Sequence, residues 1–318
     1  MGESQSTGEV ASSLYPALVV IAGATATGKT GLSLRLAEAL PGAEIISADS
    51  RRVYRSLDIG TAKVPAHARR GIPHHGLDLV DPDEPFSVAD FARCADDALR
   101  VIAGRGGIAI LVGGTGLYLR AVARGLALDQ VPFDAALRAN LERYLEAEGL
   151  VPLVDRLRLL APRLAASVDL RNARRVVRAL EIAELQGDRP LPEARGYPGR
   201  STWLGLTVDP PTHRDWIARR AREQFDAGLV EEAAAVRARG YPDDLRSLSA
   251  IGYPEAFAVL DGRLSREAAI AEDSRRNVGF SKRQKTWFRR EPDVAWFDAT
   301  TAEPLRWALE RVEALLDR

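Results

Sequence analysis

Eight residues near the N-terminus have the types and spacing needed to bind phosphate. They read G-A-T-A-T-G-K-T, which fits the pattern G-x-x-x-x-G-K-[ST]. In this pattern glycines let backbone N–H groups surround an anion, the lysine reaches the phosphates and the last hydroxyl can bind Mg²⁺. The predicted phosphate-binding loop comprises Gly23, Ala24, Thr25, Ala26, Thr27, Gly28, Lys29 and Thr30. We therefore predict that the chain binds a di- or triphosphate, with Thr30 as the Mg²⁺ ligand.

Asp49 is the second candidate for chemistry. It follows the segment Glu44-Ile45-Ile46-Ser47-Ala48, which is typical of a short strand. Ligands of parallel sheets lie at the carboxyl ends of the strands, so Asp49 is expected beside the phosphate loop. A carboxylate there can bind Mg²⁺, act as a general base or cap the following helix. The neighbouring phosphate loop favours one of the functional roles.

Thr115 is the third candidate, in the segment Gly113-Gly114-Thr115-Gly116 that follows the apolar run 108–112. A nucleotide kinase or NTPase of this kind places an aspartate at such a strand end to hold Mg²⁺. Glycines and a neutral hydroxyl suit close backbone approach and the orientation of a leaving-group oxygen. A glycine-rich turn without a ligand is the alternative.

The elements that position these residues alternate between strands and helices. Apolar runs at 18–21, 44–48, 108–112, 203–208 and 294–297 predict strands, and three- and four-residue apolar spacing predicts helices at 32–40, 86–102, 214–239 and 304–316. This order indicates an α/β fold with a P-loop nucleoside-triphosphatase-like core, in which helices flank a parallel sheet.

The alternation stops near residue 131, where apolar spacing predicts only helices, at 137–145 and 150–157. We therefore predict a core formed by 14–130 and 201–318, an all-helical insertion at 131–200, and a disordered tail at 1–13 that is rich in small polar residues.

Two basic segments point to a polyanionic partner. Arg171, Arg174, Arg175 and Arg178 are spaced to share one helix face, where like charges are unfavourable without an anion. Nearby glutamates make a solvated surface the alternative. Residues 274–290 hold seven basic and no acidic residues, with Trp287 and Phe288 among them. These aromatics can stack on RNA bases or pack into the core.

The composition is that of a globular chain without a dominant charge. Its 318 residues include 44 Lys and Arg and 44 Asp and Glu, so any nucleic-acid surface must be local. The single cysteine, Cys94, excludes an internal disulfide and fits a cytoplasmic protein. No apolar run is long enough to span a membrane. The pair His74-His75 has no third ligand at helical spacing, so we expect a structural or loop role for it.

The ordered set of short motifs resembles the tRNA dimethylallyltransferase (tRNA isopentenyltransferase) family. It covers almost the whole chain beyond residue 17. The matching segments are 23–30, 47–50 with 53–54, 58–63, 73–75, 81–82, 111–118, Asn172 with Arg175 and 178–181, 251–253, and 282–289 apart from residue 285. The resemblance implies transfer of a dimethylallyl group from dimethylallyl diphosphate to N6 of the adenosine 3′ of the anticodon, with Mg²⁺ as cofactor.

The resemblance also implies roles for individual residues. Asp49 would be the general base or hydrogen-bond acceptor at N6, and Thr115 would donate to the bridging oxygen of the diphosphate. Lys29, the loop N–H groups and Mg²⁺ on Thr30 would stabilise the leaving diphosphate, an electrostatic form of catalysis. Arg220 aligns with a family arginine near the diphosphate.

On the RNA side the resemblance implies contact with the anticodon stem-loop by Asp49, Ser50, Arg51, Arg52, Thr115, Arg138, Arg174, Arg175, Arg178, Gly252, Tyr253, Lys282 and Arg283. The chain departs from the family pattern at Arg52 and Arg174, where glutamine is common, at Pro254, which replaces a basic residue, and at Val278-Gly279. No repeated apolar seam is present, and we expect a monomer without a membrane or an obligate protein partner.

Three other functions compete with this one. An enzyme that prenylates free adenine nucleotides would need no helical insertion with an arginine-rich face. A nucleotide kinase or NTPase would need a strand-end carboxylate for Mg²⁺, which 113–115 lacks. An RNA-binding module without activity would leave the phosphate loop unexplained.

Overall fold

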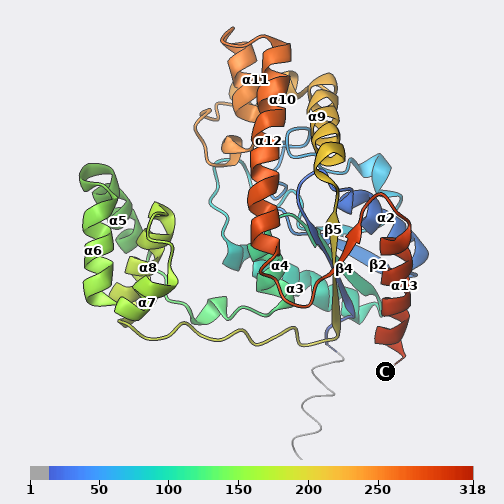
Figure 1. The fold of residues 1–318 in the computed structure, drawn as a ribbon, viewed down its shortest axis with the longest axis horizontal. Coiled ribbons are helices and arrows are strands. Elements are labelled where there is room, and N and C mark those ends of the chain that lie inside the picture. The colour runs from blue at the N-terminus through green and yellow to red at the C-terminus, as the bar shows by residue number, and fades with distance from the viewer. Residues whose placement is uncertain (1–13, 318) are drawn as a thin grey trace, which may run out of the picture. The chain divides into compact units, whose positions relative to one another are not determined.

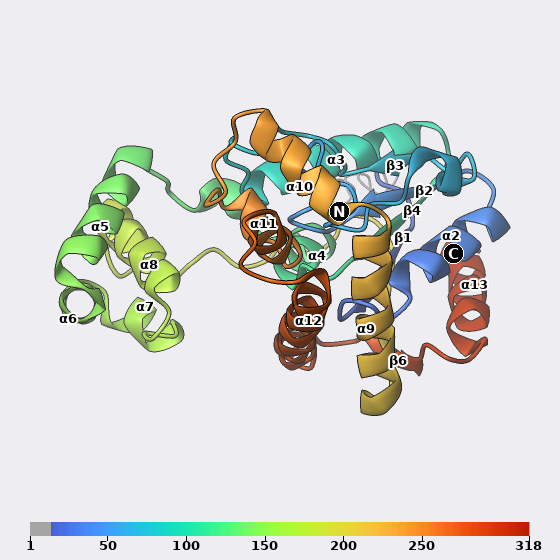
Figure 2. The same cartoon turned by 90° about the horizontal axis from the view of Figure 1, so that it is seen from above.

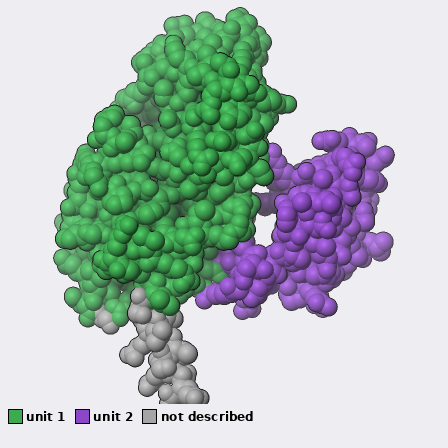
Figure 3. All heavy atoms as spheres, turned by 180° about the vertical axis from the view of Figure 1, so that it is seen from behind, with its two compact units in different colours: residues 1–125, 196–318 green, residues 126–195 purple. Residues whose placement is uncertain are grey.

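The computed structural model describes residues 14–317. The predicted tail at 1–13 lies outside the described residues. The described chain forms two compact units, 14–125 with 196–317 and 126–195, which are coloured separately in Figure 3. The predicted insertion, 131–200, differs from the second unit by five residues at each end.

Unit 1 is built on a parallel sheet of six strands in the order β3-β2-β4-β1-β5-β6. Their bounds are β1 Leu18–Gly23, β2 Ala43–Ser47, β3 His74–His75, β4 Ile108–Gly113, β5 Ser201–Thr207 and β6 Ala295–Asp298. The predicted α/β class with a parallel sheet is confirmed. Of the two roles expected for His74-His75, structural or loop, the structure supports the structural one: the pair forms β3 beside β2, and His75 Nε2 lies 2.6 Å from the carboxylate of Glu44.

Helices cover both faces of this sheet (Figures 1 and 2). The helices of unit 1 are α2 Lys29–Ala39, α3 Val88–Gly104, α4 Gly116–Ala123, α9 Pro210–Asp226, α10 Leu229–Ala238, α11 Tyr253–Leu260, α12 Arg266–Phe288 and α13 Glu303–Leu316, with short 3₁₀ turns at Ala66–Arg69 and Ser247–Ser249. Side chains alternate along a strand, so Leu18 and Val20 of β1 enter one apolar core and Val19 and Ile21 the other. Both cores hold the central strands rigidly beneath the candidate site.

The single helix expected at 214–239 is two helices in the structure. Gly228 interrupts it with φ 102°, a left-handed conformation that a helix cannot contain. The chain turns there and α10 packs against α11 instead of extending α9. This break places α10 where its Glu232 accepts hydrogen bonds from the segment 58–60.

Unit 2 consists of helices α5 Ala135–Glu148, α6 Leu150–Leu160, α7 Pro162–Ser167 and α8 Ala173–Gln186, with a 3₁₀ turn at Leu128–Gln130. They enclose a separate apolar core that includes Leu141, Leu157 and Leu180. Arg171 precedes α8, whose N-cap is Asn172, so the expected four-arginine helix face contains only three. Arg171 contacts Asp169 instead.

Glu181 on α8 holds this unit together through a buried carboxylate. It accepts hydrogen bonds from the backbone N–H of Asp134, from Arg138 and from Arg178, and it has no exposed surface. Burial alone would raise the pKa of this carboxyl, but the bonds from Arg178, Asp134 N–H and Arg138 hold it below the usual value.

We expect Glu181→Ala to destabilise unit 2 by about 3 kcal/mol, because it leaves two partly buried guanidinium groups without their anion. Hydrogen exchange followed by mass spectrometry should show faster exchange in 126–195 and no change in the sheet of unit 1. Glu146→Ala, at an exposed position of α5, is the matched control. Equal exchange in the two variants would contradict this role of Glu181.

Candidate active site

A cavity of about 1330 Å³ lies in unit 1 and brings the predicted catalytic residues together. Its wall contains Lys29 and Thr30 from the phosphate loop, Asp49 from the end of β2, Thr115 from the end of β4, and Arg220 from α9. All of these residues follow or face the carboxyl ends of the central strands, where a parallel sheet binds its ligands. The cavity is large enough for a small diphosphate and part of a second substrate.

The phosphate loop runs from β1 into α2 in the conformation that the motif requires. Gly28 has φ 82° and Ala26 has φ 57°, and the helix begins at Lys29. Alternating left-handed and right-handed residues turn successive N–H groups toward one side, and the helix N-terminus adds its positive end. Both features favour an anion at this position.

Three side chains from α9 and α12 fix Thr25 at the centre of this loop. Its N–H donates to Gln284 Oε1 (2.8 Å), its carbonyl lies 2.8 Å from His213 Nε2, and its hydroxyl accepts from Arg220 (3.0 Å). Burial lowers the pKa of His213, so the neutral ring donates from Nε2 to this carbonyl. The loop is therefore held in place before a ligand arrives.

The lowered pKa of Lys29 indicates an anion-binding site. Its ammonium donates to the carbonyl of Ala24. Burial lowers the pKa of Lys29 to about 7, with the charges of Arg220 and Arg52 adding to the effect and Asp49 opposing it. The pKa of Arg220 is lowered as well, first by burial and then by Arg52. Crowded cations that are partly desolvated gain most from a bound polyanion.

Asp49 and Thr115 are linked through Ser50. Asp49 Oδ1 accepts from the N–H of Arg51 (2.9 Å), which is the turn-capping contact considered from the sequence. Thr115 Oγ1 accepts from the N–H of Ser50 (3.0 Å) and donates a long hydrogen bond to Ser50 Oγ (3.4 Å), from which its proton can turn to a ligand in the cavity. Both side chains line the same cavity, so the capping contact leaves Asp49 able to act on a substrate.

The glycines after β4 allow a close approach, as the sequence indicates, but the approaching groups in the structure are side chains of α12, which the sequence did not identify. A Cβ at Gly114 would lie 2.5 Å from Gln284 Nε2, and one at Gly116 would lie 2.2 Å from the ring of Trp287. Gln284 donates to the carbonyl of Gly114 (2.9 Å) and so ties this segment to the phosphate loop. Trp287 and Phe288 pack here, so their core role is the one that the structure supports.

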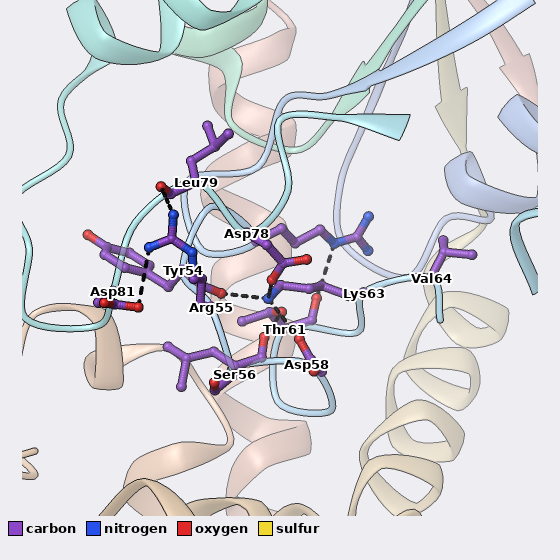
Figure 4. A network of polar contacts seen from close by, with 12 residues as sticks. Tyr54, Arg55, Ser56, Asp58, Thr61, Lys63, Val64, Asp78, Leu79 and Asp81 are labelled. Carbon is purple, nitrogen blue, oxygen red and sulfur yellow. Dashed lines mark hydrogen bonds and ion pairs between the residues drawn. The ribbon is translucent and has the colours of Figure 1, made fainter. Parts of the chain in front are cut away.

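The segment 58–63 forms another wall of the cavity and is fixed by a buried cation. The ammonium of Lys63 donates to the carbonyl of Tyr54 and to the carboxylates of Asp58 (2.8 Å) and Asp78 (2.6 Å), as Figure 4 shows. Only 3% of the Lys63 side chain is exposed, and its ammonium is bound to oxygens of the protein itself, which gives this cation a structural role.

The residues predicted to contact RNA divide into exposed and buried groups. In unit 1, Lys282 and Arg283 are exposed. Arg51 donates to the carbonyl of Arg246 and to Ser249. Gly252 and Tyr253 are buried, and the Tyr253 hydroxyl donates to Glu232 (2.6 Å), so both residues pack inside unit 1.

In unit 2, Arg174 and Arg175 are exposed, whereas Arg138 and Arg178 are paired with Glu181. Only Arg174 and Arg175 therefore retain the predicted role without breaking an ion pair of the unit.

Residues 14–317 contain no group of three His, Cys, Asp or Glu side chains that could hold a metal ion by themselves. Thr30 and Asp49 line the same cavity and are oxygen donors. Mg²⁺ typically takes one or two protein oxygens together with substrate phosphate oxygens and water, so this donor set fits Mg²⁺ that arrives with a diphosphate. No helix of the described residues is long and apolar enough to cross a membrane.

Comparison with known proteins relates both units to one family. Residues 52–291 match the family model described as IPP transferase. The tRNA dimethylallyltransferase of Halalkalibacterium halodurans is 42% identical over 291 residues, which cover 90% of this chain and 92% of that protein. The tRNA dimethylallyltransferase of Nocardioides sp. is 42% identical over 311 residues, with 94% and 97% covered.

Two solved structures are similar in fold. A full-length tRNA isopentenylpyrophosphate transferase from Bacillus halodurans aligns with a TM-score of 0.70 and 39% identity, over 94% of this chain and 96% of that chain. A eukaryotic dimethylallyltransferase acting on tRNA aligns with a TM-score of 0.73 and 25% identity, over 89% of this chain and 74% of that chain.

Proposed function

This chain belongs to the IPP transferase family, and from that premise we propose that it is a tRNA dimethylallyltransferase. It transfers a dimethylallyl group from dimethylallyl diphosphate to N6 of the adenosine 3′ of the anticodon, and releases diphosphate. The observation that supports this most directly is the cavity in which Lys29 and Arg220 face Asp49 and Thr115. An anion site and a proton acceptor thus share one space, and the end of β4 carries no carboxylate of the kind that holds Mg²⁺ in a nucleotide kinase.

The reaction forms a bond between N6 and C1 of the dimethylallyl group, while the bond from C1 to the diphosphate oxygen breaks. The electron pair leaves with the diphosphate, and N6 loses a proton. The free oxygen of Asp49 accepts this proton or a hydrogen bond from the attacking amine. The Thr115 hydroxyl, whose oxygen is already bonded to Ser50 N–H, donates to the bridging oxygen that becomes negative.

The phosphate loop, Lys29 and Arg220 bind the diphosphate and stabilise its growing charge. Mg²⁺ would be held by the Thr30 hydroxyl, and when bound it would neutralise part of the phosphate charge. Thr25 and its three partners keep the loop in the binding conformation, so little rearrangement is needed during the reaction.

On the RNA side, the adenine must leave the stack of the anticodon loop to enter the cavity. The proposed contacts to the RNA phosphates are exposed cations: Lys282 and Arg283 on α12 of unit 1, and Arg174 and Arg175 on α8 of unit 2. Such contacts predict tRNA binding that weakens steeply with salt. We further propose a monomer that acts on tRNA in the cytoplasm.

The test is mass spectrometry of nucleosides after an unmodified anticodon stem-loop is incubated with the protein, Mg²⁺ and dimethylallyl diphosphate. We expect one prenyl group on the target adenosine and none when that adenosine is replaced by guanosine. AMP serves as the rival acceptor and ATP as the rival donor. Prenyl-AMP without prenylated RNA would support a nucleotide prenyltransferase, and phosphoryl transfer from ATP without prenyl transfer would support a kinase.

A further inference from the structure

Arg52 stands where the resemblance expects a glutamine that contacts RNA. In the structure its side chain is half-buried and lines the cavity together with Lys29 and Arg220. We propose that Arg52 is a third cationic ligand of the diphosphate, beside Lys29 and Arg220, and that its main partner is the diphosphate and not the RNA. This assignment rests on the proposed function, because it names a further residue for the same substrate.

The guanidinium of Arg52 is held at its inner nitrogen. Its Nε donates to the carbonyl of Thr61 (3.2 Å). Within residues 14–317 its two terminal nitrogens make no hydrogen bond or ion pair, so both remain available to an anion. A guanidinium presents its donors in a planar fork that matches two phosphate oxygens.

The carbonyl of Thr61 is itself part of a fixed segment. Glu232 of α10 accepts the N–H groups of Asp58 (3.0 Å), Ile59 (2.8 Å) and Gly60 (3.0 Å). From α9, Gln224 donates to the carbonyls of Ile59 (2.6 Å) and Gly60 (3.0 Å). These bonds leave Thr61 little freedom, so they fix the inner end of the Arg52 guanidinium.

The charge of Arg52 acts on the same groups that would hold the diphosphate. It contributes to the lowered pKa of both Lys29 and Arg220, and Asp49 is the carboxylate that opposes it at both residues. Asp58 and Asp78 on this wall are bound to Lys63, while Glu223 lines the cavity and, with Asp273, also opposes the effect at Arg220. Lys29, Arg220 and Arg52 repel one another, and a bound diphosphate would turn that repulsion into attraction.

Burial separates this reading from an RNA contact. Lys282 is exposed, and Arg283 lines the cavity but is exposed as well, as expected for groups that meet a large polyanion at the surface. Arg52 is half-buried, and its charge reaches the lysine of the phosphate loop. A glutamine at this position could accept and donate hydrogen bonds but would add no charge to the diphosphate site.

The experiment compares wild type, Arg52→Gln and Arg52→Lys, with Arg93→Gln on the exposed face of α3 as the control for loss of an arginine. Inorganic diphosphate with Mg²⁺ is the probe, and its dissociation constant is measured by calorimetry. We expect binding to weaken about tenfold in Arg52→Gln, as loss of one charged hydrogen-bond donor implies, to recover partly in Arg52→Lys and to stay unchanged in Arg93→Gln.

Steady-state kinetics with each substrate varied in turn then separate the two partners. We expect the KM for dimethylallyl diphosphate to rise about tenfold in Arg52→Gln, and the KM for the anticodon stem-loop to change less than about twofold. A raised KM for the stem-loop with unchanged diphosphate binding would show an RNA contact and overturn the proposal. Unchanged values for both substrates would overturn it as well.

The thermal unfolding midpoint of the unliganded protein tests whether Arg52 has a purely structural role. We expect Arg52→Gln to keep or raise it, because one of three mutually repelling cations is removed, and to reduce the rise that inorganic diphosphate produces. A lower midpoint without ligand would mean that Arg52 stabilises the fold, which would overturn the proposal. If wild type binds inorganic diphosphate through Arg52 but transfers no prenyl group, the proposed function fails while this assignment stands.

Discussion

Replacing Asp49 with asparagine is expected to lower the rate of prenyl transfer by a factor of about 10²–10⁴, the range for a lost general base. Asparagine can still accept the hydrogen bond that Asp49 Oδ1 receives from the Arg51 N–H, so the turn after β2 should persist. It cannot accept the proton of N6. Single-turnover measurement with saturating stem-loop and dimethylallyl diphosphate reports this step directly, because substrate binding and product release are then removed from the observed rate.

Asp49→Ala distinguishes a role of Asp49 in capping the turn from a role in accepting the proton. If Asp49 served only to cap the turn, alanine would impair the enzyme and asparagine would not. If it is the proton acceptor, both variants lose the same step. Asp83→Ala, at an exposed loop position, is the matched control and should transfer at the wild-type rate. Transfer by Asp49→Asn within about threefold of wild type would contradict a general-base role, since that effect is far below the usual range.

The strand–loop–helix units of the core follow from the sequence because their signals are local. The apolar run before Gly23 and the spacing after Thr30 predict β1 and α2, and the pattern of glycines predicts the loop between them. The same reasoning places Asp49 and Thr115 at neighbouring strand ends, and they do line one cavity. Local pattern and sheet topology together are enough for that part of the site.

Features that depend on tertiary contact could not be predicted in this way. The apolar spacing of 214–239 continues across Gly228, so only the observed left-handed φ reveals the break between α9 and α10. β3 has two residues, too few for a periodic signal, and is defined by its pairing with β2. Arg171 has the spacing of α8 but lies before the Asn172 cap. These boundaries depend on a left-handed glycine, on strand pairing and on a helix cap, none of which is visible in the apolar pattern.

Several residues that support the site were missed for the same reason. Gln284 lies within a basic helix, and Glu232 belongs to a helix distant in sequence from the segment that it holds. Tyr253 belongs to a motif of the resemblance, yet its hydroxyl binds Glu232 inside the unit. A buried polar residue on an otherwise charged helix is the signal that could have identified Gln284, but its partners are known only from the fold.

Binding of dimethylallyl diphosphate is expected to draw a proton onto Lys29. In the unliganded protein the pKa of Lys29 is about 7, lowered by burial and by Arg220 and Arg52. A bound anion favours the charged ammonium and raises that pKa again. At pH 8 the unliganded lysine is largely neutral and the bound one is charged, so about one proton should be taken up; at pH 6 uptake through Lys29 should nearly vanish.

Calorimetric titration in two buffers of different ionisation enthalpy measures this uptake, and Lys29→Met is the comparison, because protons exchanged by the ligand itself cancel between the two proteins. The variant should show no uptake through residue 29 and should transfer the prenyl group about 10²–10³ times more slowly, as loss of a donor to the leaving group implies. The same pKa has a consequence for stability. Between pH 7 and 10.5 the folded protein holds fewer protons at Lys29 than the unfolded chain, so the unliganded enzyme should gain stability as the pH rises through that range. Equal proton uptake by both proteins at pH 8 would show that Lys29 is already charged in the empty site, and the cation cluster would then lack the electrostatic strain that prepares it for diphosphate.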